Sequence, residues 1–392
     1  MTATSATLRV GLSSTMIEPV LTGGRLDGIG VYTRALLDHL PAAGVEVLPF
    51  SFAPPGGLQQ LSVGRALPLS FPVATLGDMI LPASAYLDVS RPLAAQGGAP
   101  LDLFHATDYR IVRMDCPVVA TLHDALPVSH PQWCNPKWRR LKNWLQIRAA
   151  RKAQHVIAPS RHAVRELVQF FGIDEKKISV VHHGARAEWF DAPPVAARDA
   201  TLAQYGLQAG YFLFVGTLQP RKNVERLLDA YLALPPVLRA TRQLLVVGAP
   251  GWRSAELVQR LKAARERGEN VVWLDRLTDD NQLRHLYAGA GAFIFPSLHE
   301  GFGLPLLEAF ASGVPVASAH ATSLPEVAQG AALEFDPLSV AEITAAMTTL
   351  ARDDGARARL IGAGRRRALE MTWADAARRT TAVYRHVLAG RG

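Results

Sequence analysis

The sequence has few cysteines and no long apolar segment. Its 392 residues include two cysteines, Cys116 and Cys134, which are too few for a disulfide framework and lack metal-ligand spacing. Nowhere do about 18 uncharged apolar residues follow one another, and residues 1–6 lack the basic flank and apolar core of a secretory signal. We therefore expect reduced cysteines, no membrane-spanning helix and a cytoplasmic protein.

Negative charge is also in short supply. Lys and Arg number 42 against 34 Asp and Glu, which gives a formal net charge of +8. Such an excess favours an anionic partner: nucleic acid, a phospholipid surface or a phosphorylated substrate. Much of the excess positive charge comes from arginines spread along expected helices, including residues 365–367. Such a distribution is typical of an ordinary solvated surface. We therefore expect no nucleic-acid partner.

The length and the order of apolar segments predict two α/β domains. A chain of 392 residues with 49% hydrophobic content exceeds the size at which one core stops growing. Short apolar segments alternate with amphipathic helical ones, which predicts doubly wound parallel sheets covered by helices on both faces. The expected strands of the first domain are residues 8–12, 45–50, 103–105, 118–122, 156–158 and 178–182. Those of the second are residues 211–215, 244–247, 271–274, 292–295, 316–318 and 332–335.

The expected boundary between the domains lies within residues 184–210. This segment contains the Pro193-Pro194 pair and an alanine-rich, weakly patterned stretch, which is typical of a linker rather than a core element. The first domain then covers residues 1–195 and the second covers residues 196–371.

The remaining residues, 372–392, are expected to form a helix that packs back on the first domain. Thr372 and Asp375 match a capping box. At helical spacing, five residues share one face that must dock against another element. They are Trp373, Ala377, Thr380, Tyr384 and Val387.

Four loops that follow expected strands could hold a ligand, because open α/β sheets bind ligands at the carboxyl ends of their strands. The first, residues 23–32, opens a helix and contains Gly28 and Gly30. Glycines let a backbone approach a ligand closely, and a helix amino terminus suits a phosphate. The pattern lacks the third glycine of the dinucleotide fingerprint, so a plain turn explains it equally well.

The second and third loops carry a histidine and a pair of cations. His123 and Asp124 follow strand 118–122, with no serine or cysteine elbow to complete a hydrolase triad, so His123 is either structural or catalytic. Arg221 and Lys222 precede an amphipathic helix. Cations at a helix start are unfavourable unless an anion joins them, which indicates a diphosphate. Two solvated surface cations are the alternative.

The fourth loop, within residues 295–310, combines carboxylates with backbone amides. Glu300 follows a strand, and Pro305 suits the first position of the next helix, which places Glu308 in that helix's opening turns. The carboxylates can accept hydrogen bonds from hydroxyl groups, and the amides of residues 301–304 can donate to them. Such a site suits a polyol.

The fourth loop also carries a family resemblance. Glu300, seven intervening residues and Glu308, within EGFGLPLLEAFASGVPV, resemble the signature of retaining family 4 glycosyltransferases of the GT-B fold. The segments DGIGVYTRALL, TLHDALPVSHP, VIAPSRHAVREL and VGTLQPRKN resemble further motifs of that family. The resemblance implies two Rossmann-like domains facing across a cleft, the first on the acceptor side and the second binding a nucleotide sugar.

The same resemblance implies roles for the residues of the four loops. Gly28, Gly30 and their loop would face the donor diphosphate, His123 would lie beside the transferred sugar as a catalytic residue, and Arg221 and Lys222 would neutralise the phosphates.

Further roles follow for the fourth loop and for the segment after strand 271–274. Glu300 would act on the donor sugar as the second catalytic residue, and Glu308 would accept from the ribose hydroxyls. Many relatives carry arginine where this chain has Thr217, and Arg221 is expected to replace it. The donor sugar would also contact the amides of Gly301, Phe302, Gly303 and Leu304. The base would lie near Asp275, Arg276 and Leu277.

Within the family, the segments HATDYRIV, LHDALPVSHP and GTLQPRKN resemble bacterial mannosyltransferases that build O-antigen or exopolysaccharide from GDP-mannose. GDP-mannose would be the co-substrate and a saccharide or lipid-linked saccharide the acceptor, with no other cofactor. The alternatives are a UDP-sugar donor, a sugar-nucleotide epimerase or phosphorylase of similar fold, and a nucleic-acid-binding protein. Two mechanisms of retention at the anomeric carbon agree with the sequence: attack on the same face as the leaving phosphate, and a covalent intermediate.

Two further expectations concern metal and membrane. The sequence has no Asp-x-Asp pair, the ligand set of metal-dependent sugar transferases, so we expect no metal and assign stabilisation of the leaving diphosphate to cations and helix dipoles. Residues 133–151 combine Trp138 and Trp144 with several cations, as in segments that touch an anionic bilayer. An ordinary surface helix is the alternative, and membrane contact would make the protein peripheral at the inner face of the plasma membrane.

Overall fold

The computed structural model describes residues 7–24, 26–52, 61–67, 69–80, 87–95, 97–134, 136–277 and 279–390. These residues form two compact units. The first comprises the described residues up to Ser129, those of 136–183, and those from Trp373 onward. The second comprises residues 184–372 and the short segment 130–135. Residues 1–6, on which the absence of a secretory signal was argued, lie outside the described part of the chain.

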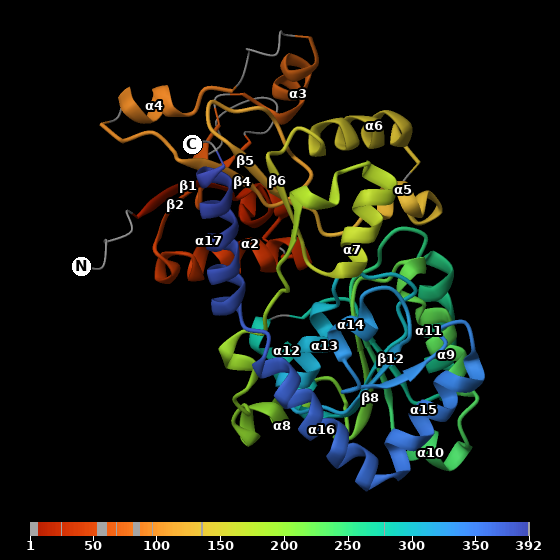
Figure 1. The fold of residues 1–392 in the computed structure, drawn as a ribbon. Coiled ribbons are helices and arrows are strands. Elements are labelled where there is room, and N and C mark those ends of the chain that lie inside the picture. The colour runs from red at the N-terminus through yellow and green to blue at the C-terminus, as the bar shows by residue number, and fades with distance from the viewer. Residues whose placement is uncertain are drawn as a thin grey trace. The chain divides into compact units, whose positions relative to one another are not determined.

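The first unit is built on a seven-stranded parallel sheet with the order β3-β2-β1-β4-β5-β6-β7. Figure 1 labels β1, β2, β4, β5 and β6 of this sheet. The middle strands β4, β5 and β6 are buried along their whole length, because helices cover both faces. The strands are β1 (Leu8–Ser13), β2 (Val45–Ser51), β3 (Arg65–Ala66), β4 (Leu103–Ala106), β5 (Val118–Thr121), β6 (His155–Ala158) and β7 (Ile178–Val180).

Helices of very different length surround this sheet. Helix α7 continues directly into a π-helical turn, Leu167–Phe171. The α-helices are α1 (Pro19–Thr22), α2 (Gly28–His39), α3 (Phe71–Ile80), α4 (Ser90–Ala95), α5 (Leu126–Ser129), α6 (Arg139–Ala150), α7 (Arg161–Glu166) and α17 (Trp373–Ala389). Three short 3-10 turns are η1 (Thr15–Ile17), η2 (Pro41–Ala43) and η5 (Glu175–Lys177).

Helix α17 completes the first unit, where it packs beside α2 (Figure 1). Its Tyr384 hydroxyl hydrogen bonds Nδ1 of the fully buried His105 at 2.7 Å, and Nε2 of His105 hydrogen bonds the Thr121 hydroxyl at 2.8 Å. Burial, with a contribution from His123, lowers the pKa of His105 to about 3, so the ring stays neutral. At the other end of α17, the Trp373 ring stacks on His183 at 5.5 Å. Four residues of the face expected from the sequence are buried, Trp373, Ala377, Thr380 and Tyr384, and the fifth, Val387, is half-buried.

The Tyr384 hydroxyl is expected to stabilise the first unit. In Tyr384→Phe, one ring nitrogen of buried His105 loses its partner, so the free energy of unfolding should fall by about 1–3 kcal/mol. Denaturant titration followed by tryptophan fluorescence measures the loss. Arg385→Ala, on the exposed face of the same helix, is the control. Equal losses in both variants would contradict a specific role for the hydroxyl.

The second unit contains a six-stranded parallel sheet with the order β10-β9-β8-β11-β12-β13. The chain moves outward from β8 in one direction through β9 and β10, then crosses back and continues in the other direction from β11. The strands are β8 (Tyr211–Val215), β9 (Leu244–Val247), β10 (Val271–Leu274), β11 (Ala290–Phe295), β12 (Val316–Ala319) and β13 (Leu333–Phe335).

The helices of the second unit bury their apolar faces on this sheet. Helix α9 is typical, since Val224, Leu227, Leu228 and Tyr231 recur at helical spacing and are each at most 1% exposed. The helices are α8 (Val195–Gln204), α9 (Val224–Leu232), α10 (Pro236–Thr241), α11 (Ala255–Glu266), α12 (Asp280–Gly289), α13 (Leu304–Ala311), α14 (Leu324–Ala328), α15 (Val340–Arg352) and α16 (Asp354–Leu369).

The prediction that residues 184–210 form a linker is wrong for much of this segment. Residues 195–204 form helix α8, which packs against α12, and Trp189 in the 3-10 turn η6 (Ala187–Trp189) is 3% exposed. Alanine favours the helix, and Pro194 immediately precedes it. Few apolar residues are needed because α8 buries only Thr201 and Leu202. The second unit accordingly begins at Gly184.

Candidate functional site

The second unit gathers its candidate residues where the strand order reverses. Strands β8 and β11 are neighbours, but the chain leaves them in opposite directions, which makes their carboxyl ends the topological switch point of the sheet. Open α/β sheets bind ligands in the crevice at this point. The loop after β8 carries Arg221 and Lys222, and the loop after β11 carries Glu300.

Local backbone geometry brings the two cations to this edge. Arg221 and Lys222 lie in a 3-10 turn, η7 (Pro220–Lys222), which ends at Asn223 in the left-handed region with φ 59°. The side-chain Nδ2 of Asn223 donates to the carbonyls of Pro296 (3.0 Å) and Pro337 (2.7 Å). The amide of Leu298 donates to the Arg221 carbonyl at 2.7 Å, which ties the loop after β8 to the loop after β11.

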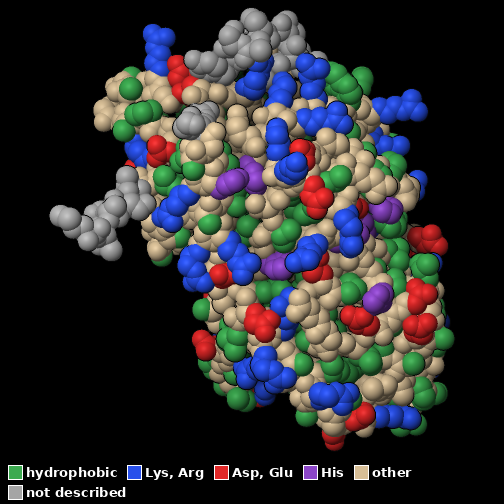
Figure 2. All heavy atoms as spheres, in the orientation of Figure 1, with side chains coloured by type: hydrophobic (Ala, Val, Ile, Leu, Met, Phe, Trp, Pro, Cys, Tyr) green, Lys and Arg blue, Asp and Glu red, His purple; other side chains and the backbone are tan. Residues whose placement is uncertain are grey.

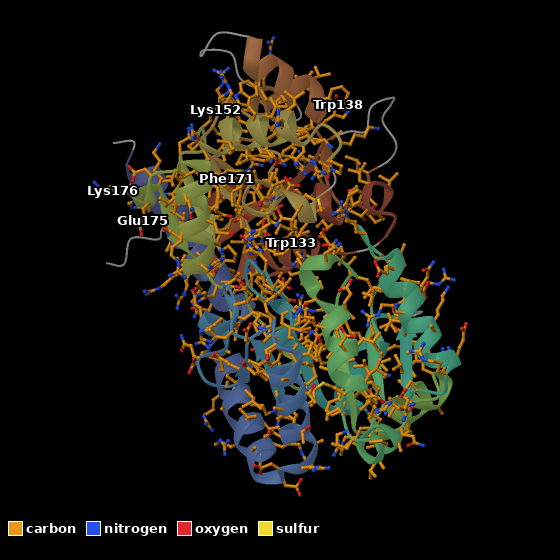
Figure 3. All side chains as sticks on the ribbon, turned by 90° about the vertical axis from the view of Figure 1, so that its right-hand side faces the viewer. Trp133, Trp138, Lys152, Phe171, Glu175 and Lys176 are labelled. Atoms are coloured by element: carbon orange, nitrogen blue, oxygen red, sulfur yellow. The ribbon has the colours of Figure 1, made fainter. Side chains whose placement is uncertain are left out.

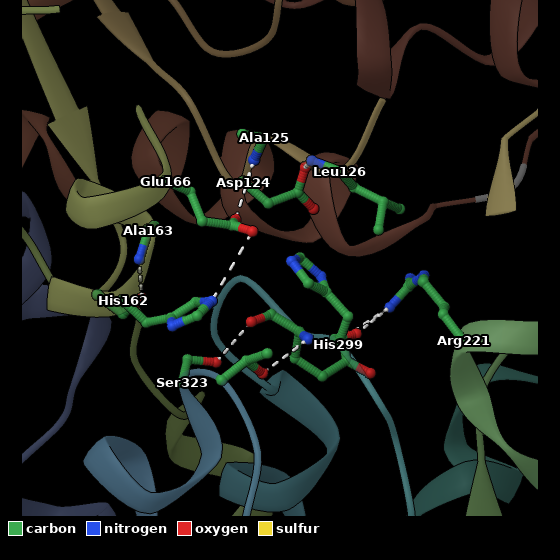
Figure 4. Close-up of polar contacts among 12 residues, drawn as sticks. Asp124, Ala125, Leu126, His162, Ala163, Glu166, Arg221, His299 and Ser323 are labelled. Atoms are coloured by element: carbon green, nitrogen blue, oxygen red, sulfur yellow. Dashed lines mark hydrogen bonds and ion pairs between the residues drawn. The ribbon is translucent and has the colours of Figure 1, made fainter. Parts of the chain in front are cut away.

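Glu300 binds both cations directly. Lys222 Nζ donates to Oε1 at 2.6 Å, and Arg221 Nη1 donates to Oε2 at 3.0 Å. Arg221 Nη1 also donates to the His299 carbonyl at 2.9 Å (Figure 4). Lys222 is 6% and Glu300 7% exposed, and the Lys222 ammonium also lies 5.0 Å from the centre of the Phe295 ring. Arg221, Lys222 and Glu300 are named the cation–carboxylate cluster.

Burial and pairing set the charge states of this cluster. Burial alone would raise the pKa of Glu300, but the charges of Lys222 and Arg221 outweigh it and hold this pKa at about 2. Burial lowers the pKa of Lys222 to about 8, although the charge of Glu300 opposes the shift. The cluster therefore carries two cations and one anion at neutral pH, a net positive charge suited to a diphosphate.

Two residues that the sequence analysis missed hold Glu300 in place. The Thr322 hydroxyl accepts from the Glu300 amide at 3.1 Å, and the Ser323 hydroxyl donates to the carbonyls of Glu300 (2.8 Å) and Phe302 (3.0 Å) (Figure 4). Thr322 has φ 53°, an unusual value for a β-branched residue. Such outliers cluster at functional sites. No sequence motif marked this loop; only its place after β12 could have suggested it.

The segment after Glu300 leads into helix α13 and its carboxylate. Gly303, at φ 107°, turns the chain so that α13 starts at Leu304 and presents the amides of its first turn. Glu308 is half-buried, and the Tyr287 hydroxyl donates to its Oε2 at 3.4 Å. Burial raises the pKa of Glu308 to about 7, with Arg186 partly opposing the shift.

The segment expected near the base lies apart from the switch point. Residues 275–277 follow β10, the edge strand, which is separated from β8 by β9. Asp275 and Arg276 are exposed and Leu277 is half-buried against the core.

The first unit carries the remaining expected residues. Gly28 is exposed at the start of α2, whereas Gly30 is buried. The Gly30 amide donates to Oδ1 of the capping residue Asp27 at 2.8 Å, and a Cβ on Gly30 would lie 2.8 Å from the Met16 carbonyl. Close packing against Met16 is therefore one reason for a glycine at this position.

His123, also in the first unit, has both ring nitrogens engaged. Nε2 donates to the Thr107 carbonyl at 3.0 Å, so Nδ1 accepts from Nε2 of His183 at 3.3 Å. The edge of His123 meets the Tyr32 ring, with the ring centres 5.0 Å apart. Burial lowers the pKa of His123, against the hydrogen bond to Thr107. The imidazole is therefore neutral and fixed in one tautomer.

Basic side chains are dispersed over the face of the protein that Figure 2 shows, rather than gathered in one patch. Three large apolar side chains of the α6 region are nevertheless exposed among cations: Trp138 (68%), which immediately precedes α6, and Leu141 (51%) and Trp144 (48%) within it. Figure 3 labels Trp138 at the start of this helix. Among the described residues, no helix is both long and apolar enough to cross a bilayer.

Comparison with protein families places both halves of the chain. Residues 204–367 match the model of glycosyl transferases group 1, and residues 26–189 match that of glycosyltransferase family 4. O-antigen chain mannosyltransferase B of Escherichia coli is 31% identical over 72% of this chain and 74% of its own. MMP alpha-(1->4)-mannosyltransferase of Mycolicibacterium hassiacum is 28% identical over 79% of this chain and 76% of its own. Mannosyltransferase WbdA of Escherichia coli is 28% identical, but the chain spans only 32% of its length.

Solved structures resemble the whole chain. Sucrose-phosphate synthase of Thermosynechococcus elongatus has a TM-score of 0.71 at 21% identity, covering 98% of this chain and all of its own. HepE of Anabaena, solved with UDP and glucose, has a TM-score of 0.69 at 19% identity, covering 96% of this chain and 98% of its own. Together with the two parallel sheets, these likenesses confirm the predicted GT-B fold.

Proposed function

Because the chain belongs to glycosyltransferase family 4, we propose that it transfers mannose from GDP-mannose to a saccharide or lipid-linked saccharide acceptor, with retention at the anomeric carbon. The product would be a bacterial surface polysaccharide. Two relatives support this choice of sugar by their names, an O-antigen chain mannosyltransferase and an MMP mannosyltransferase.

The cation–carboxylate cluster is the observation that carries the proposal. Its two cations would bind the donor diphosphate and stabilise the charge that develops on it as the glycosidic bond breaks, without a metal ion. Glu300 holds both cations in position and would act on the sugar beside them. The loop of Thr322 and Ser323 fixes the backbone of Glu300 through hydrogen bonds to its amide and its carbonyl.

The other expected residues complete the proposed donor site and acceptor side. Glu308 would accept from the ribose hydroxyls, the amides of residues 301–304 would donate to the sugar, and residues 275–277 would lie near the base. In the first unit, Gly28 and Gly30 would face the donor diphosphate, and His123 would lie beside the transferred sugar as a catalytic residue. His123 offers the sugar a neutral ring, because its proton is held on Nε2.

We place the protein in the cytoplasm, peripheral to the inner face of the plasma membrane. The exposed Trp138, Leu141 and Trp144 of α6 support a shallow contact with anionic lipid. This contact would bring the active site to a lipid-linked acceptor.

A thermal-shift screen in EDTA tests the proposed donor. A ligand present at 100 times its Kd stabilises the native state by about 2.7 kcal/mol. GDP-mannose and GDP should therefore raise the Tm more than UDP-glucose and UDP do. Larger shifts with the UDP compounds would favour a UDP-sugar transferase, and no shift with any nucleotide would overturn the proposal. Consumption of donor to an isomer without acceptor would indicate an epimerase instead.

Turnover should depend on pH through two groups of the second unit, the half-buried Glu308 and the buried Lys222. As pH falls through about 7, Glu308 gains a proton and loses acceptor capacity; as pH rises through about 8, Lys222 loses its charge. The profile of kcat/KM for the donor, which reports the free enzyme, should peak between these values. Glu308→Gln should abolish the fall of kcat/KM on the acid side of the profile. Lys222→Arg should abolish the fall on the alkaline side. Persistence of both falls in these variants would contradict the assignment.

A further inference from the structure

The first unit contains a cavity of about 410 Å³ at the switch point of its own sheet. Strands β1 and β4 are neighbours from which the chain departs in opposite directions, and the segments that follow them supply Met16 and residues 108–111 of the lining. Crevices at this place in open α/β sheets bind ligands, and the volume lies within the range of about 300 to 1,000 Å³ typical of small-molecule sites.

The walls of this cavity are apolar. Ile29 comes from α2, Phe71 from α3, and Leu145 and Ala149 from the inner side of α6. No charged side chain of the described residues lines the cavity on α2 or α3, so these helices offer a surface for a hydrocarbon chain rather than for a sugar.

Cations outnumber anions where polar side chains meet the cavity. Among the described residues, its lining includes Arg110, Lys142 and Arg148 but a single carboxylate, Asp108. Arg110 pairs with Asp108, and the Arg148 guanidinium lies 5.5 Å from the centre of the Trp144 ring. Lys142 is exposed and forms no ion pair with any described residue. The cavity therefore has an excess of positive charge available to an anionic group.

The cavity is joined to the residues expected to face the substrates. The hydroxyl of Tyr109, which lines it, donates to the Asp124 carbonyl at 2.5 Å and to Oδ1 of Asp124 at 3.0 Å. Asp124 follows His123 directly. Gln146 also lines the cavity, and its Oε1 is buried without a hydrogen-bond partner among the described residues, so it can accept from a ligand hydroxyl.

We propose that this cavity binds an amphiphilic acceptor: an apolar chain between α2, α3 and α6, with a phosphate group on Lys142, Arg148 and Arg110. The saccharide end would then extend past Tyr109 toward Asp124. The term acceptor rests on the proposed function, whereas binding of the amphiphile does not.

Calorimetry with the full chain and decyl phosphate, below its micelle concentration, tests the cavity. Decanol lacks the anion and inorganic phosphate lacks the chain, so each should bind at least about tenfold more weakly. Lys142→Glu should weaken decyl phosphate binding about tenfold, the equivalent of one charge-assisted hydrogen bond. Leu145→Asp should weaken it further. Arg140→Glu, an exposed charge reversal on α6 outside the cavity, should leave it unchanged.

Three results would overturn the proposal. The first is decyl phosphate binding no more tightly than inorganic phosphate, and the second is Arg140→Glu weakening decyl phosphate binding as much as Lys142→Glu does. The third is binding of the protein to phosphatidylglycerol vesicles while neither cavity variant changes its affinity for decyl phosphate, which would assign α6 to a bilayer. Circular dichroism and GDP binding check that Leu145→Asp is folded. In the unsubstituted protein, GDP binding without decyl phosphate binding counts against the cavity alone, whereas decyl phosphate binding without GDP binding counts against the proposed function alone.

Discussion

Replacing Glu300 by glutamine is expected to lower kcat by about 10² to 10³ while the affinity for free GDP changes little. The carboxylate would act beside the transferring sugar, where positive charge develops, and GDP carries no sugar at that position. Glutamine preserves the size of the side chain, and the backbone of residue 300 keeps its hydrogen bonds to Thr322 and Ser323. The cations stay near the diphosphate because the amide oxygen of glutamine can still accept from Lys222, and Arg221 still donates to the His299 carbonyl. The variant therefore removes chiefly the negative charge.

The companion variant for this test is Glu308→Gln. A contact with the ribose is present before and during the reaction, so its loss should raise KM for the donor and Kd for GDP alike. Steady-state kinetics and GDP calorimetry separate the two outcomes, with Glu256→Gln on the exposed surface of α11 as the control. If Glu300→Gln lost GDP affinity as severely as Glu308→Gln and kept its kcat, the two roles would be wrongly assigned.

Lys222→Met is expected to reduce both activity and stability. Without the ammonium, the donor diphosphate loses a buried cation, and kcat/KM should fall by about 10² to 10³. Glu300 keeps only Arg221 as an ionic partner, and breaking a buried ion pair costs about 3–5 kcal/mol. Kinetics and denaturant titration measure the two losses.

A double variant separates these effects. Lys222→Met combined with Glu300→Gln removes both charges, so it should be more stable than Lys222→Met alone yet remain inactive. Lys222→Arg keeps the cation and should retain much more of the stability than Lys222→Met. A double variant as unstable as Lys222→Met would show that lost packing, rather than the uncompensated carboxylate, is the cause.

The strands were predictable because burial on both faces makes them continuous apolar segments. Every expected strand coincides with an observed one to within two residues at either end. Strand β3 was missed because it has only two residues, Arg65 and Ala66, neither of which forms an apolar pattern. Helix α8 was mistaken for a linker because its alanines give little amphipathic contrast, even though they favour a helix.

The sequence marked the members of the donor site but not their pairing. Arg221 and Lys222 were attributed to a phosphate and Glu300 to the sugar, yet the ion pairs among them depend on β8 and β11 being neighbours, which no local pattern specifies. Thr322 was missed because its contribution arises from a strained backbone angle and one hydroxyl. The cavity in the first unit was missed for a similar reason, since its lining comes from segments far apart in the chain.

The position of α17 in the first unit has a consequence for synthesis on the ribosome. Residues 184–372 of the second unit are synthesised before α17. At about 5–20 residues per second, synthesis of this segment takes on the order of 10 to 40 s. During this time His105 lacks the Tyr384 hydroxyl, and His183 lacks the Trp373 ring. The second unit can therefore finish folding first, although most of the first unit leaves the ribosome earlier. Until residues 373–389 emerge, the nascent chain exposes the surface beside α2 that α17 covers, the region where a chaperone would be expected to bind.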